Sequence, residues 1–190
     1  MEKIEVIRDF EQSVKDFHLP RTSELPELDF YMDQVISIME KNLYLLSVDP
    51  SSKFITPAMI NNYVKLGIIP PPKKKRYSKE HICYLFIITT LKSVIPIPAI
   101  SQMIKNQTQK RTVYELYDIF CEAYENMLGE AISTSRAIIQ ENNESIEDAI
   151  SELSLFMAIN AGTTQLIAGN GLKLLSEDDS EAENEKNTKK

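Results

Sequence analysis

Seven cationic side chains lie between Pro50 and Lys79, and no acidic residue accompanies them. The whole chain has 21 basic and 28 acidic residues, so the other positions hold 21 − 7 = 14 basic against 28 acidic residues, a charge of −14. Localised positive charge in an acidic background is what binding to nucleic acid requires. A solvated surface loop is the alternative, and charge alone leaves both open. The seven residues are Lys53, Lys65, Lys73, Lys74, Lys75, Arg76 and Lys79.

Residues that support metal, redox or hydrolytic chemistry are sparse. The two histidines, His18 and His81, are far apart in sequence, and we interpret His81 as a surface residue. Cys83 and Cys121 lack a CxxC partner and are expected to be small core residues. No phosphate-binding loop, dinucleotide fingerprint, nucleophile elbow or HExxH is present. The sequence therefore predicts no metal, no cofactor and no enzyme, and Glu122 and Glu125 are taken as a solvated helix face.

Cysteine usage and the N-terminal residues bear on the compartment. Two unpaired cysteines are typical of a reduced, cytosolic chain. The first residues contain acid and no continuous apolar run, so export is not expected. We predict a cytoplasmic protein.

A short helix over residues 56–66 is the element best placed to read DNA. Thr56 suits the cap position, Pro57 the first helical position and Gly67 the left-handed position after the end. Asn61, Asn62 and Lys65 would face outward, and asparagine can bond two edge atoms of adenine. Asparagine in a short helix is also commonly a solvated surface residue, so this alternative stays open.

Apolar spacings of three and four predict further helices before and after this segment, which makes the fold class all-α (mainly helical). Three consecutive prolines, 70–72, predict an extended connection or a sheet edge before the basic run. The predicted organisation is an N-terminal helix at 1–18, a central domain at 19–107, a C-terminal helical hairpin at 108–175 and a disordered polar tail at 176–190.

Two stretches of sequence carry a family resemblance. TPAMINNYVKLGIIP at 56–70 is followed by a basic turn and then by RYSKEHI at 76–82. This order resembles the MerR superfamily, which has a serine or threonine cap, a recognition helix with a tyrosine, a G-[LI]-[LI]-P exit, a basic wing and an R-Y-[ST]-x-E-x-[LI] helix start. LPELDFYMDQV at 25–35 also resembles a bacterial group known as domain of unknown function number 1836, over about Leu19 to Ile104.

The MerR resemblance implies a winged helix-turn-helix with a small β wing, and a function as a sequence-specific DNA-binding transcriptional regulator. Helix 56–66 would enter the major groove of double-stranded DNA, and the basic wing at 70–77 would contact phosphates. It implies Thr56 as helix cap and Tyr63 as a backbone contact. The predicted DNA-binding residues are Lys53, Thr56, Asn61, Asn62, Tyr63, Lys65, Lys73, Lys74, Lys75, Arg76 and Tyr77.

One departure from that family keeps an alternative open. MerR relatives usually have arginines in the recognition helix where this chain has Ala58 and Asn61. A non-enzymatic protein–protein adaptor that keeps the fold but has lost DNA binding is the second hypothesis.

The C-terminal hairpin, expected from helices at about 112–141 and 145–168, is the predicted partner surface. Leu153 to Leu172 contains no charged residue, and its polar residues and glycines favour a packed helix interface over a membrane span. In MerR-like regulators a long helix after the DNA-binding domain pairs subunits, which implies a homodimer. A hairpin that merely covers its own N-terminal domain is the alternative. No pocket signature identifies a small-molecule effector.

Overall fold

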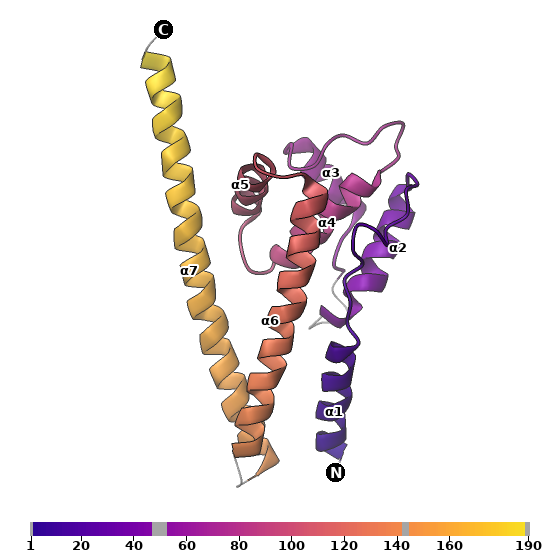
Figure 1. The fold of residues 1–190 in the computed structure, drawn as a ribbon, viewed down its shortest axis with the longest axis vertical. Helices are drawn as coiled ribbons and strands as arrows, with labels where there is room; N and C mark the ends of the chain where they lie inside the picture. Colours follow the sequence, from indigo (N-terminus) through magenta and orange to yellow (C-terminus); the bar gives the residue numbers. More distant parts are fainter. Residues whose placement is uncertain (1, 47–52, 142–144, 189–190) are drawn as a thin grey trace.

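The protein is mainly helical, as predicted. A computed structural model describes residues 2–46, 53–141 and 145–188, with side chains at 8–46, 53–140 and 145–174. Over these residues the chain forms seven α-helices and one 3-10 turn, arranged along the long central helix α6 (Figure 1). Their bounds are α1 Glu2–Lys15, α2 Met32–Leu43, η1 Tyr44–Leu46, α3 Pro57–Lys65, α4 Lys79–Leu91, α5 Ile97–Thr108, α6 Val113–Glu141 and α7 Ile146–Thr188.

The expected small β wing is not formed as a sheet. Among the described residues there is no strand, only two isolated antiparallel bridges, Phe30 with Tyr77 and Lys73 with Arg76. Prolines 70–72 have no N–H to donate, so no ladder can extend back along the chain from Lys73. The wing is therefore one tight turn, attached to the start of α2.

Helix α4 is the centre of the hydrophobic core. Eight of its side chains are buried, among them Ile82, Leu85, Phe86 and Ile88. A helix that is apolar on all sides must be covered by neighbours, and α2, α5 and α6 pack against it. Tyr117 of α6 stacks on Phe86, with ring centroids 5.5 Å apart. Helix α3 and the turn before α4 both rest on this core, through Ile60 and Tyr63 of α3 and through Tyr77 after the turn.

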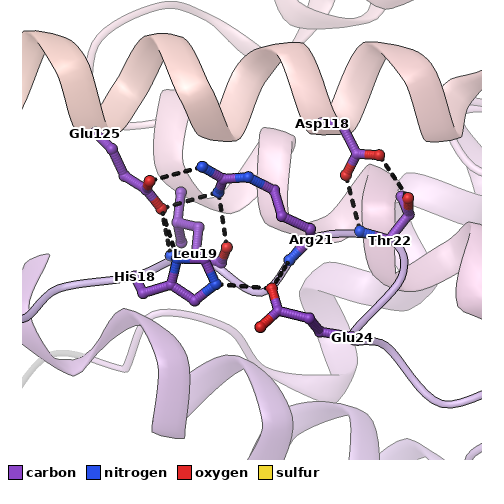
Figure 2. A network of polar contacts seen from close by, with 7 residues as sticks. All are labelled: His18, Leu19, Arg21, Thr22, Glu24, Asp118 and Glu125. Atoms are coloured by element: carbon purple, nitrogen blue, oxygen red, sulfur yellow. Dashed lines mark hydrogen bonds and ion pairs between the residues drawn. The ribbon is translucent and has the colours of Figure 1, made fainter.

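The connection from α1 to α2 is fixed to α6 by a polar network (Figure 2). The Arg21 guanidinium donates to both carboxylate oxygens of Glu125, at 2.9 and 2.7 Å. The Leu19 N–H donates to Glu125 at 2.8 Å, and the N–H and hydroxyl of Thr22 donate to Asp118. Burial opposes ionisation of Glu125, but the hydrogen bonds from Arg21 and Leu19 outweigh it and lower its pKa. The interpretation of Glu125 as solvated was wrong.

The α6–α7 hairpin extends away from this core. The two helices diverge from the end of α6 and the beginning of α7, and α5 lies between the first turns of α6 and the middle of α7 (Figure 1). Helix α7 continues to Thr188, through the polar segment that composition led us to expect as disordered. Many large apolar side chains of α7 remain exposed. In the described part of the chain, no helix combines the length and apolar character that a bilayer crossing demands.

Candidate nucleic-acid interface

Helix α3 begins and ends as its sequence predicts. The Thr56 hydroxyl accepts a hydrogen bond from the Met59 N–H at 3.3 Å, and Pro57 occupies the first helical position. Gly67 has a φ of +68°, which L side chains rarely adopt, and the Ile68 N–H donates to the Tyr63 carbonyl across the helix end. The predicted cap role of Thr56 is confirmed, and the helix is nine residues long.

The two faces of α3 differ sharply. Ile60 and Tyr63 are buried, whereas Asn61, Asn62 and Lys65 are exposed together on the other side. Only 3% of the surface of Tyr63 is exposed, and burial raises the pKa of its phenol. We therefore assign Tyr63 to the core rather than to the interface.

A strained turn presents the three consecutive lysines. The Arg76 N–H donates to the Lys73 carbonyl at 2.9 Å, and Lys74 and Lys75 between them have φ values of 51° and 61°. Two central residues with positive φ define a type I′ turn, for which Asn-Gly is the favoured sequence. A left-handed residue other than glycine costs about 1–2 kcal/mol. Such strain is concentrated at functional sites, and here it holds two exposed ammonium groups at a tip.

Arg76 is exposed but is held by α2. Its guanidinium lies 4.4 Å from the centroid of the Tyr31 ring and donates to the Tyr31 hydroxyl at 2.8 Å. Phe30 and Tyr77 exchange two backbone hydrogen bonds of 2.8 Å at the same place. Tyr77, also predicted to contact DNA, is 3% exposed and belongs to the core. These contacts fix the base of the turn, and Tyr31 is a residue of the candidate site that sequence reasoning missed.

Lys79 differs from the other cations of the segment because, among the described residues, it forms an ion pair with an acidic side chain. Its ammonium lies 2.6 Å from the Glu27 carboxylate, and this hydrogen bond raises the pKa of Lys79. Within the described residues, no ion pair involves the cations of α3, its leading segment and the turn tip. These five, all exposed, are Lys53, Lys65, Lys73, Lys74 and Lys75.

His81 connects the start of α4 to the segment before the turn. It is 5% exposed, so the surface interpretation was wrong. The Ser78 N–H donates to Nδ1 at 3.0 Å, so Nε2 carries the proton of the neutral ring and donates to the Pro70 carbonyl at 3.1 Å. Burial lowers the pKa of His81, against the raising effect of the Pro70 hydrogen bond. A neutral imidazole thus positions the proline segment.

Lys92, just beyond α4, secures the segment that leads into α3. Its ammonium donates to the Phe54 carbonyl and lies 3.5 Å from the Met59 sulfur. Burial lowers the pKa of Lys92. No local pattern in the sequence indicated this contact, because the partners are 38 residues apart.

Other chemistry has little support in the arrangement. Burial raises the pKa of the Cys83 thiol to about 12 and that of Cys121 to about 11. Thiols with such high pKa values are poor nucleophiles and metal ligands. Among the described residues, no group of three histidine, cysteine, aspartate or glutamate side chains is placed to hold a metal ion.

Comparison with known proteins gives one finding. A family model described as Domain of unknown function (DUF1836) matches residues 20–126, more than half of the chain. The match covers α2 to α5, the strained turn and α6 as far as the Glu125 network. No curated protein and no solved structure matches the chain.

Proposed function

The chain belongs to the DUF1836 family, and we propose that it acts as a sequence-specific DNA-binding regulator of transcription. The observation that carries the proposal is the strained turn, where Lys74 and Lys75 adopt a conformation that lysine avoids while their side chains point into solvent. Exposed asparagine and glycine would form the same turn at lower cost, so the described part of the chain gives no structural reason for lysine there. A polyanionic partner accounts for both charges.

In the proposed complex, α3 enters the major groove and the turn contacts the backbone. Asn61 and Asn62 are exposed on the outward face of α3, where amide groups can bond base edges. The five exposed lysines contact phosphates, while Arg76 holds the turn against Tyr31. Tyr63 and Tyr77 support the two elements from the core. The tight turn takes the place of a wing in a MerR-like helix-turn-helix, which remains part of the proposal.

We further propose that the protein binds DNA as a homodimer through its C-terminal helices. A nine-residue helix reads only a few base pairs, so a single copy has little basis for specificity. Two copies related by a two-fold axis add the contacts of two half-sites. The exposed apolar side chains of α7 supply a surface for this pairing.

The test is selection of bound sequences from random duplex DNA by the purified protein. Wild type should enrich a two-fold symmetric sequence. A variant with both Asn61→Ala and Asn62→Ala should bind with weaker sequence preference and an unchanged salt slope. A matched control, Lys105→Gln with Lys110→Gln, removes two exposed charges outside the interface and should leave both properties unchanged. Absence of binding to any duplex at low salt contradicts the proposal.

A second candidate function is the protein–protein adaptor without DNA binding. Two observations favour it: Ala58 and Asn61 stand on the outward face of α3 in place of arginines, and α7 exposes a broad apolar surface. A protein that assembles normally but selects no sequence, with lysine variants of the turn indistinguishable from wild type on duplex DNA, would favour the adaptor over the regulator.

A further inference from the structure

One face of α7 is apolar, exposed and flanked by single charges. Between Glu152 and Lys173 lie twenty residues without charge. Their large exposed apolar side chains are Leu155 (64%), Phe156 (46%), Ile159 (57%), Leu166 (65%) and Ile167 (73%), of which the first four lie on this face. The helix also contacts its own chain: the Gln165 amide, at the edge of this face, donates to the Val94 carbonyl at 2.6 Å, and Leu172 packs on the core. The large apolar side chains of the exposed face are therefore not the ones that anchor α7.

Positions along this face follow the spacing of a helix-pairing stripe. Glu152, Leu155, Ile159, Gly162, Leu166, Gly169 and Lys173 are separated alternately by three and four positions. This is the repeat that keeps one seam of a helix against a second helix. In water, such a seam is stable only when it is covered.

Two hollows lie along the same face. One, of about 350 Å³, lies between α6 and α7, and its α7 lining consists of Glu152, Leu155, Phe156 and Ile159. The other, of about 310 Å³, lies over the second half of the window and is lined by Gly162, Gln165, Leu166, Gly169, Asn170 and Lys173. Large apolar side chains thus border the first hollow, and two of the six residues that line the second are glycines.

The α7 segment that borders the first hollow fits the segment that borders the second when a second copy of the helix lies antiparallel to the first. A two-fold axis between Gly162 and Thr163 relates positions whose numbers add to 325. It brings Ile159 opposite Leu166, Phe156 opposite Gly169 and Leu155 opposite Asn170. The four α7 residues that line the first hollow thus meet four that line the second. At each end Glu152 meets Lys173, a pair of opposite charge.

Gly162 and Gly169 border open space in the part of the chain that the structure describes. A Cβ added to Gly162 or Gly169 would meet no atom within 4 Å. Glycine inside a helix costs about 0.5–1 kcal/mol relative to alanine. The close approach of a second helix to this face would explain why glycine occupies these two positions.

We propose that two copies of this chain pair through α7 as an antiparallel, two-fold symmetric helix pair centred between Gly162 and Thr163. Phe156 and Leu155 of each copy enter the glycine-lined hollow of the other, and the two Glu152–Lys173 pairs close the ends. The proposal rests on the homodimer of the proposed function and gives it a register. It does not depend on DNA binding.

Glycine substitutions give the first test, by sedimentation velocity of the full chain over a concentration series. Gly169→Leu fills the hollow and should raise the dimer dissociation constant at least tenfold. Gly171→Leu is the matched control: its Cβ also meets open space, it gains the same helix propensity, and it lies off the stripe. It should dimerise as wild type does. Equal behaviour of the two variants, or a wild type that is monomeric at tens of micromolar, overturns the proposal.

A charge exchange tests the antiparallel register. Glu152→Lys and Lys173→Glu should each raise the dissociation constant several-fold, because like charges then meet at both ends. The variant with both changes should regain the wild-type value. A parallel pair would place each position opposite itself, so each single change would only replace one like-charged contact by another and leave the dissociation constant almost unchanged. Single variants that dimerise as wild type does, or a double variant that does not recover, contradict the register. A wild type that stays monomeric in solution but co-sediments with lipid vesicles would assign the face to a membrane surface and refute the pairing.

Failure of this inference is distinguishable from failure of DNA binding. A dimer with the expected variant behaviour that binds no duplex supports the α7 pairing and contradicts the regulator. A monomer that selects a DNA sequence without two-fold symmetry supports the regulator and contradicts the α7 pairing.

Discussion

Replacing the two strained lysines by the residues that their turn prefers separates conformation from charge. The change is Lys74→Asn with Lys75→Gly, at φ values of 51° and 61°. Relief of two left-handed residues gains about 2–4 kcal/mol, from which the added flexibility of glycine subtracts about 0.5–1 kcal/mol. Asparagine also keeps part of the strain, so a net gain of about 1–2 kcal/mol is expected. At about 2–4 °C per kcal/mol for a chain of this size, Tm rises by about 2–8 °C.

DNA binding should change in the opposite direction. Each phosphate contact contributes about 0.9 to the slope of log affinity against log salt, so two lost contacts flatten the slope by about 1.8. At 0.1 M salt, the same counterion release is worth roughly 60-fold in affinity. The variant is thus expected to be the more stable protein and the weaker binder.

Two measurements check this: thermal unfolding by circular dichroism, and fluorescence anisotropy on selected duplex DNA from 50 to 300 mM salt. Lys105→Gln with Lys110→Gln controls for the loss of two exposed charges elsewhere. An unchanged salt slope in a variant whose Tm has risen would refute the phosphate role of the turn. A lowered Tm would refute the strain argument instead.

Three further predictions follow from contacts of the site and its support. Glu125→Gln should lower the free energy of unfolding, measured by urea denaturation, by about 1–3 kcal/mol, because it removes the carboxylate that accepts two hydrogen bonds from Arg21. Glu122→Gln, at an exposed position of the same helix, should change this free energy little, and equal effects of the two variants would show that the network does not stabilise the fold. Burial lowers the pKa of His81, so as the pH is lowered below about 6.5 the unfolded chain takes up a proton before the folded one and the folded state loses stability; above that pH the contribution of His81 is fully present. Glutamine is a usual residue at this position of a capping box, so His81→Gln should reduce the difference in urea midpoint between pH 7.5 and pH 5.5. A difference as large as that of wild type would show that another group is responsible for the pH dependence. Tyr31→Ala removes the ring and the hydroxyl that hold Arg76 and should weaken DNA binding about fivefold. The salt slope should stay almost unchanged, because the number of cations is the same; a large fall in the slope would show that Arg76 needs Tyr31 to reach a phosphate.

Local signals in the sequence predicted α3 well. Thr56, Pro57 and Gly67 act within one turn of the backbone they control, so their types alone indicated the start and end of the helix. The division of its faces, with Asn61 and Asn62 outward, followed from helical spacing. Local chemistry of this kind needs no knowledge of the remaining chain.

Contacts between distant segments were not predictable in this way. Glu125 looked solvated because its partner Arg21 is 104 residues away, and His81 looked exposed because its acceptor, Pro70, lies beyond a turn of unknown shape. The wing was expected to be a β element, but a proline run on one side leaves only a two-residue turn. The lack of charge in α7 predicted a helix interface, which stays a prediction, and the register that we propose for it rests on hollows that only the structure shows.

The Arg21–Glu125 network also has a consequence for how this architecture tolerates length changes. Asp118 and Glu125 are seven positions apart, two turns of α6, so one inserted residue between them would rotate one anchor by about 100° away from the linker. The family match ends at residue 126, directly after the second anchor. Beyond it, Arg136 pairs with Glu11 of α1 at 2.8 Å, and neither residue lies in the matched range. The Arg136–Glu11 pair between the outer half of α6 and α1 therefore lies outside the matched range, whereas both carboxylates that hold the linker before α2 lie inside it.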